Sequence, residues 1–277
     1  MTTDWQPTAS LACLQARAQM LAAARRFMQE RTILEVETPA LTHCAVSDPN
    51  LRSLAVAAGD HLPLFLHTSP EYCMKRLLAA GSGDIYQICK VFRGEESSAL
   101  HNPEFTMLEW YRLGFPMQSL IDEVALLLRS LLAISAGAQF TLPPQQITYH
   151  EALRRHAGID LMSVSEPQLR QRALRSGLAG DSAARCDRDQ LLDFIMAVEV
   201  GPLLGREQLT FVTHYPASQA ALARLDPQYP DCALRFELFG KAWSSPMVLK
   251  NSPTRMNRRH VSPPIACCDQ RAVWTSP

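Results

Sequence analysis

The stretch from residue 84 to residue 111 constrains the fold of this chain more than any other segment. Two β-prone runs, 84–92 and 103–111, enclose a polar loop, which is typical of two strands joined by a long connection. Successive side chains of a strand point to opposite faces, so Glu109 and Tyr111 are predicted to share one face, with Trp110 on the other. The pattern therefore predicts a strand pair with charged residues on one face.

The rest of the chain alternates helical and strand-like segments. Ser10 is predicted to cap a helix over 11–31. Further helices are predicted over 72–80, 118–132 and 187–200, and strands over 32–39, 64–68, 208–214 and 233–239. This order favours an α+β fold in which helices flank a largely antiparallel sheet.

Composition excludes several classes of protein. Hydrophobic residues are 47% of the chain and charged residues 19%, which excludes overall disorder. Lys and Arg number 27 and so do Asp and Glu, so nothing favours a nucleic-acid-coating role. No apolar run approaches the roughly 18 residues that span a bilayer, and the N-terminus lacks a secretory pattern. We expect a cytoplasmic protein without membrane association.

The eight cysteines are scattered and form no C-x-x-C pair. A zinc site is therefore not favoured, and the cysteines are predicted to be mostly small buried residues.

The segment from Arg93 to Tyr111 concentrates the residues with chemical potential. Arginine suits phosphate or carboxylate because its planar fork is always charged, and carboxylates suit Mg²⁺ or an ammonium group. A charged strand pair with a solvated face is the alternative, and spacing alone leaves both open. The residues concerned are Arg93, Glu95, Glu96, His101, Asn102, Glu104, Glu109 and Tyr111.

Three colinear segments resemble the class II aminoacyl-tRNA synthetases of the lysyl kind. Residues 92–96 (FRGEE) and 101–111 (HNPEFTMLEWY) resemble motif 2 of that class, and residues 27–39 (FMQERTILEVETP) resemble motif 1, which makes its dimer interface. Residues 68–72 (TSPEY) and 74–77 (MKRL) resemble its lysine-side loop. The resemblance implies a class II catalytic domain, an antiparallel sheet flanked by helices, that forms a homodimer.

The position of the motifs narrows the resemblance further. Motif 1 begins near residue 27, so the anticodon-binding domain that precedes it in a lysyl-tRNA synthetase is expected to be absent. Residues 213–219 (THYPASQ) and 235–237 (RFE) are similar to the short paralogues that ligate β-lysine to elongation factor P.

This resemblance implies that ATP activates (R)-β-lysine, or α-lysine less well, as an adenylate. The acyl group then passes to a lysine ε-amine of elongation factor P. A lysine-activating enzyme with another acceptor, such as tRNA, and a non-catalytic pseudoenzyme are the alternatives.

The resemblance assigns roles to the residues of the amino-acid pocket. Arg93 is the expected catalytic residue, neutralising charge on the substrate carboxylate and the α-phosphate of ATP. Glu71 and Glu109 are expected to pair with the substrate ammonium. Tyr111 is expected to hydrogen-bond the same group, and Ser69 to line the pocket.

A second set of residues is expected to bind ATP and its Mg²⁺. Besides Arg93, the resemblance implies that Glu95 and Asn102 hold the adenine end. It places Glu237, with Leu238 beside it, at ATP, and makes Glu237 the metal ligand. His101 and His214 are expected to be structural or solvent-facing.

The family pattern disappears after Phe239. Residues 240–277 hold six Lys or Arg and one acid, whereas the preceding 239 residues have a surplus of five acids. The next family strand (G-[IM]-E-L-A-N-G-F) and the later motif 3 strand and helix are not found. We therefore predict an incomplete catalytic domain over 1–239 and a non-homologous tail over 240–277. A missing central strand predicts an exposed sheet edge.

A change of reading frame accounts for this tail. When residues 239–254 are written with suitable synonymous codons and one T is added at Phe239, the shifted frame reads FWQGMELANGFKELTD, which is the missing family strand. We predict that residues 240–277 are the product of a lost nucleotide, and that the 277-residue chain is unstable or inactive. A functional divergent tail is the alternative.

Overall fold

The computed structural model describes residues 7, 9–48, 51–57, 59, 63–94, 102–134 and 142–240, and the backbone of 247–251 and 269–276. Its helices are α1 (Leu11–Gln29), α2 (Glu71–Ala79), α3 (Met117–Leu132), α4 (Tyr149–Ala157), α5 (Glu166–Arg175), α6 (Gly180–Arg185) and α7 (Arg188–Ile195). A π-helical turn (Met196–Val200) and two 3₁₀ turns (Gly201–Leu203, Ala217–Gln219) follow α7. The strands are β1 (Leu34–Glu35), β2 (Leu41–Thr42), β3 (Ala55–Val56), β4 (Leu64–Leu66), β5 (Ile85–Phe92), β6 (Glu104–Leu113), β7 (Gln145–Thr148), β8 (Thr210–Pro216), β9 (Cys232–Gly240), β10 (Met247–Asn251) and β11 (Asp269–Ser276).

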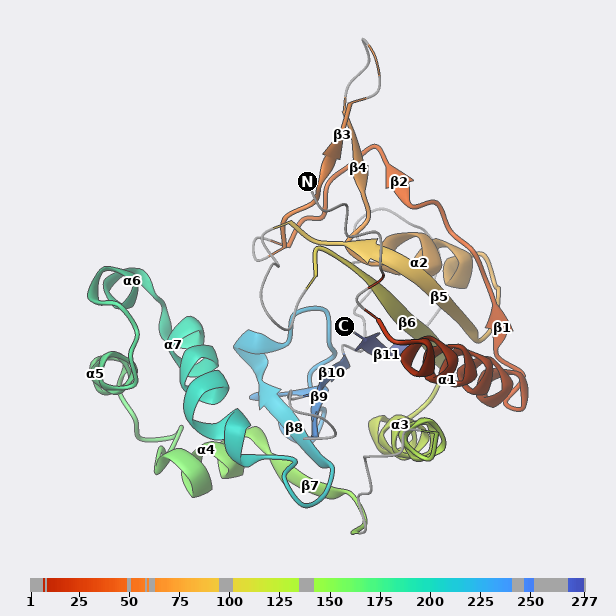
Figure 1. Cartoon of the computed structure of the whole chain (residues 1–277). Helices are drawn as coiled ribbons and strands as arrows, with labels where there is room; N and C mark the ends of the chain where they lie inside the picture. The colour runs from red at the N-terminus through yellow and green to blue at the C-terminus, as the bar shows by residue number, and fades with distance from the viewer. Residues whose placement is uncertain are drawn as a thin grey trace.

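The strands form one large sheet and one small sheet. The large sheet has the order β1-β5-β6-β11-β10-β9-β8-β7, and the small sheet has the order β2-β4-β3 (Figure 1). In the large sheet, β1 runs parallel to β5 and β7 parallel to β8, while the other neighbours are antiparallel. The prediction of an α+β fold with a largely antiparallel sheet is confirmed.

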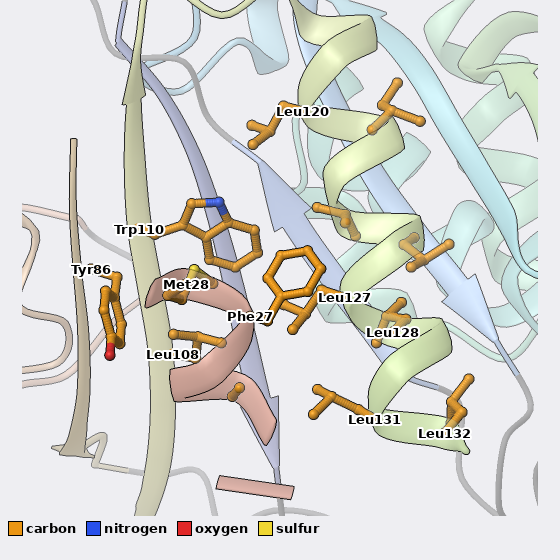
Figure 2. Close-up of a cluster of buried hydrophobic side chains, with 14 of the residues drawn as sticks. Phe27, Met28, Tyr86, Leu108, Trp110, Leu120, Leu127, Leu128, Leu131 and Leu132 are labelled. Atoms are coloured by element: carbon orange, nitrogen blue, oxygen red, sulfur yellow. The ribbon is translucent and has the colours of Figure 1, made fainter. Parts of the chain in front are cut away.

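Helices α1 and α3 lie side by side on one face of the large sheet (Figure 1). The Ser10 side chain accepts the Cys13 N–H at 3.2 Å, which confirms the predicted cap of α1. Figure 2 shows Phe27 of α1 and the leucines of α3 packed against Trp110 of β6. Each leucine buried here stabilises the fold by roughly 1.5–3 kcal/mol, because its apolar surface leaves water.

The opposite face of the large sheet carries α2 at one end and α4 to α7 at the other. Met74 and Leu78 of α2 pack against Ile85 and Tyr111 of the β5–β6 pair. Helices α4, α5 and α7 pack on β7, β8 and the end of β9, with Val212 in that core. Strands β11, β10 and most of β9 lie between these two helical groups.

The prediction of an exposed sheet edge after Phe239 is wrong, because the backbone of the tail pairs with both strands that would otherwise form that edge. Strand β11 pairs with β6 along its whole length, and β10 pairs with β9 from Gly240 to Phe236. Ladder hydrogen bonds join backbone groups, so a segment without proline can pair with an open strand whatever its side chains. The strands β10 and β11 contain no proline, although the tail around them does.

The cysteines are more exposed than predicted. Among the six that the structure describes, Cys13 and Cys44 are exposed and the other four are half-buried. Among the described residues, no helix combines the length and the apolar composition that crossing a membrane requires.

Candidate functional site

A fully buried carboxylate lies at the centre of the candidate site. Glu109 of β6 accepts hydrogen bonds from the Ser69 hydroxyl and the Tyr111 hydroxyl, each at 2.7 Å. Glu109 and Tyr111 share one face of the sheet as predicted, and Ser69 reaches them from the turn that precedes α2. Two hydroxyl donors stabilise an anionic side chain that burial alone would penalise. The structure therefore brings three of the predicted substrate-binding residues together.

Glu71 joins this cluster through the first turn of α2. Its backbone N–H donates to the Ser69 hydroxyl at 3.1 Å, and its carboxylate lies 2.5 Å from the ammonium nitrogen of Lys75. Both side chains of this pair are largely buried. Glu71 thus already holds an ammonium group. The sequence prediction missed Lys75, although the four-residue spacing on a helix is the signal that indicates such a pair.

Strand β5 contributes a further polar side chain that the sequence prediction missed. Gln87 is the direct cross-strand neighbour of Glu109, is buried, and accepts a hydrogen bond from the Thr38 hydroxyl at 3.0 Å. Cys89 follows on the same face. Burial, assisted by the negative charge of Glu109, raises the pKa of the Cys89 thiol to about 12. The thiol therefore stays protonated at neutral pH and is no nucleophile.

Arg93 follows β5 directly and adjoins the carboxylate cluster. Its Nε donates to the carbonyl oxygen of Thr68 at 3.3 Å, one residue before Ser69. Its guanidinium carbon lies 5.1 Å from the centre of the Phe105 ring. These two contacts hold the guanidinium of Arg93 beside the turn that carries Ser69.

Not all of the predicted nucleotide-binding residues can be placed. Asn102 is exposed just before β6 begins. Glu95 and His101 lie outside the described residues.

Glu237 lies on the same face as Glu109, across the sheet. The two residues belong to one cross-strand row, in which Glu109 pairs with Val273, Val273 with Lys250 and Lys250 with Glu237. Three strand spacings separate them, which is on the order of 14 Å. Glu237 is buried and pairs with Arg235, the distance from Oε1 to the guanidinium being 2.5 Å.

Leu238, which is expected beside Glu237 at ATP, turns its side chain away from the Glu237 face. It is fully buried in the core beneath α1 and α3, on the face opposite Glu237. The alternation of a strand turns neighbouring side chains to opposite faces, so only the backbone of Leu238 can meet a ligand on the Glu237 face.

Glu237 suits the metal that the resemblance implies. Mg²⁺ is usually held by one or two carboxylates together with substrate phosphates, so a single oxygen ligand at this position fits it. Within the described residues, no three His, Cys, Asp or Glu side chains gather to hold a metal by themselves.

The face beneath α1 and α3 is structural. Trp110 donates to Glu123 at 2.9 Å, and Arg112 lies 3.2 Å from the same carboxylate. Burial raises the pKa of Glu123, although Arg112 opposes the change.

His214 lies 3.4 Å from Asp226, within a bulge of β8, which agrees with the structural role predicted for it.

Comparison with known proteins adds to this geometry. The family model of tRNA synthetases class II (D, K and N) matches residues 3–246. A protein of Erwinia tasmaniensis named elongation factor P–(R)-β-lysine ligase is 47% identical over 246 residues, 87% of this chain and 73% of the relative. Proteins of the same name from Pectobacterium atrosepticum and Yersinia enterocolitica are 45% and 44% identical over 245 residues, with the same coverage. The chain therefore belongs to the class II tRNA synthetase family of the D, K and N type, and it is an enzyme of the ligase type.

Proposed function

We propose that the site activates (R)-β-lysine with ATP as an adenylate and transfers the acyl group to a lysine ε-amine of elongation factor P. The observation that carries this proposal is the buried Glu109, held by Ser69 and Tyr111 beside Glu71 and next to Arg93. The names of the similar proteins support the substrate and the acceptor.

The carboxylates of Glu71 and Glu109 select a substrate with a second amine. An ammonium group that enters this pocket replaces part of the hydrogen bonding that Lys75 and the two hydroxyls now supply. A substrate without that amine leaves a buried carboxylate without a cation, which is costly.

Arg93 acts at the first chemical step. The carboxylate oxygen of β-lysine attacks the α-phosphorus of ATP, and pyrophosphate leaves with its electron pair. Negative charge gathers on the α-phosphate oxygens, where a fixed guanidinium stabilises it. In the second step the acceptor nitrogen attacks the carbonyl carbon, and AMP leaves. Mg²⁺, when bound with ATP, neutralises phosphate charge, and Glu237 would hold it.

A homodimer is the proposed assembly. The outer face of α1 and the following β1 strand expose three leucines to solvent, Leu11, Leu14 and Leu34. Exposed large apolar side chains on an element that a family uses for dimerisation favour a protein interface. Leu34 lies within the segment 27–39 that resembles the dimer-forming motif, and Leu11 and Leu14 lie on the helix that leads into it.

We propose further that residues 240–277 are a frameshifted tail and that the chain carrying it turns over poorly. The family match ends at residue 246, and the charge balance changes near the same point. The strands β10 and β11 fill the sheet, but their sequence is not that of the family strand. On this account the chain as it stands is closer to a pseudoenzyme that keeps part of a ligase pocket.

Acceptor specificity tests the proposal. The chain, and the same chain with one T restored at the Phe239 codon, are each incubated with ATP and (R)-β-lysine, with elongation factor P or tRNA as acceptor. Mass spectrometry is expected to show one added β-lysine on elongation factor P with the restored protein. Charging of tRNA instead would favour the alternative acceptor, and no product from either acceptor would refute the proposed reaction.

A further inference from the structure

We propose that Arg235 is the positioning residue of Glu237, and that Tyr215 and the carbonyl of Gln219 hold Arg235 in place. The guanidinium thereby sets the direction in which the Glu237 carboxylate meets Mg²⁺ and ATP. This inference rests on the proposed function, because it takes Glu237 to be the residue at the nucleotide.

The two residues stand on β9, two positions apart, and so share a face. One guanidinium nitrogen of Arg235 lies 2.5 Å from Oε1 of Glu237, and the other donates to the Gln219 carbonyl oxygen at 2.5 Å. Two bonds in different directions fix the plane of the guanidinium. Because one carboxylate oxygen is held by that plane, the direction of the other oxygen is fixed as well.

An aromatic stack holds the guanidinium from a third side. The guanidinium carbon of Arg235 lies 4.4 Å from the centre of the Tyr215 ring, and the Tyr149 ring lies 4.7 Å from Tyr215, centre to centre. Both tyrosines are fully or almost fully buried. A stack of this kind restrains a planar cation better than an ammonium, so lysine is not an equivalent replacement.

The helical layer anchors this arrangement. The side chain of Gln219 donates to the Asp189 carbonyl oxygen of α7 at 3.3 Å. The backbone carbonyl oxygen of Gln219 accepts the hydrogen bond from Arg235. Arg235 is thus tied to α7 on one side and to Glu237 on the other.

The charges in the cluster favour the ion pair. Burial lowers the pKa of Arg235, but Glu237, together with Tyr215 and Asp193, outweighs this effect and the net pKa is raised. Burial and the Glu237 charge both raise the pKa of Tyr215, so its hydroxyl stays neutral. That hydroxyl lies close enough to the Glu237 carboxylate to interact with it, although the geometry is not that of a good hydrogen bond. The part of Tyr215 that contacts Arg235 is its ring.

The test compares Arg235→Gln with the wild-type 277-residue chain in two measurements. In a crystal structure of the variant, the Glu237 carboxylate is expected to leave its wild-type position. In calorimetric titrations, the Kd for ATP with Mg²⁺ is expected to rise about 10- to 100-fold, the usual cost of losing an outer partner of a metal ligand. The Kd for ATP without Mg²⁺ is expected to stay unchanged.

Further variants separate positioning from stability. Tyr215→Leu is expected to behave as Arg235→Gln does, whereas Tyr215→Phe keeps the ring and is expected to bind as the wild type does. Arg172→Gln breaks a comparable arginine–glutamate pair, to Glu199, away from the site and should leave nucleotide binding unchanged. If Arg235→Gln does not fold, Arg235→Lys takes its place in both measurements. This variant keeps the charge but not the planar group, so the same changes are expected.

Two results overturn the inference. One is a Glu237 carboxylate that keeps its place in the variant, and the other is Mg²⁺–ATP binding that is unchanged or tighter. If the wild-type 277-residue chain binds no Mg²⁺–ATP, the titrations are repeated with the restored protein, and absence of binding there as well would count against the proposed function. The position of Glu237 in the variant crystal still decides the inference.

Discussion

Glu109 shows how one buried residue determines what the site can bind. It has no contact with solvent, and its two oxygens are satisfied by the hydroxyls of Ser69 and Tyr111. Hydroxyl donors stabilise the anion without neutralising it, so the carboxylate still attracts a cation. Under the proposed function, this carboxylate is the group that recognises the second amine of the substrate.

Replacing Glu109 by glutamine tests this view. The variant keeps the size of the side chain but removes its charge, so the substrate ammonium loses its buried partner. We expect the Kd for (R)-β-lysine to rise by at least about 30-fold, which corresponds to about 2 kcal/mol. Binding of ATP measured by calorimetry should stay unchanged. Glu123→Gln, on the opposite face of the sheet, serves as the control and should leave β-lysine binding intact.

Two glycines show how elements are joined. Gly158 ends α4 with a φ of +68°, and Gly205 has a φ of +64° in the segment before β8. A Cβ on Gly158 would meet nothing within 4 Å, whereas one on Gly205 would lie 2.5 Å from the Phe239 carbonyl group. Only the second glycine lets the chain pass close to the end of β9.

The pair Gly158→Ala and Gly205→Ala isolates the effect of that close approach. Both changes place a Cβ in the left-handed region, which costs about 1–2 kcal/mol. Gly205→Ala also creates a backbone clash and is expected to cost roughly 2 kcal/mol more. Urea unfolding monitored by circular dichroism measures the free energy of unfolding of both variants. Equal destabilisation of the two variants would contradict the packing of this segment against β9.

The contact between α5 and the π-helical turn predicts a pH dependence. Hydrogen bonds from Arg172 lower the pKa of Glu199, and Ser176 adds to the effect. The folded state then binds fewer protons than the unfolded state, so this contribution is present above the ordinary carboxyl range. It is lost as the pH falls through the folded pKa. Arg172→Gln should lower the urea midpoint at neutral pH, and the difference from wild type should shrink in acid. A difference that does not depend on pH would show that the ion pair does not matter.

Most elements with a strong periodic pattern could be predicted from the sequence. The leucine spacing of α3 and the alternation of β5 and β6 placed those elements within two residues of their observed ends. Alternation also placed Glu109 and Tyr111 on one face. The two-residue strands β1, β2 and β3 have too little sequence to show any period.

Long-range pairing was beyond the reach of sequence patterns. The row that places Glu237 on the Glu109 face depends on β10 and β11, whose pairing is made by backbone groups. Lys75 and Arg235 were missed as site residues because each acts through a neighbouring carboxylate. Leu238 is expected beside Glu237 at ATP, and alternation along β9 turns its side chain into the core, so only its backbone can take part.

At the scale of the whole molecule, the exposed leucines on α1 and β1 predict an association between copies. Leu14→Glu places a charge on this face without touching the buried core, since Leu14 is exposed. Light scattering is expected to show a dimer for the wild type and a monomer for the variant. Leu174→Glu, at another exposed leucine on α5, is the control and should stay dimeric. A wild-type monomer would contradict the proposed assembly.

The most direct test of the account is (R)-β-lysine-dependent exchange between ATP and pyrophosphate, measured for the 277-residue chain and for the chain with one T restored at Phe239. The restored protein is predicted to exchange. The 277-residue chain is predicted to be at least about 100-fold slower, because displaced nucleotide contacts can cost that much. Equal, robust exchange by both proteins would contradict the frameshift proposal. No β-lysine-dependent exchange by the restored protein would contradict the central claim, that this pocket activates β-lysine.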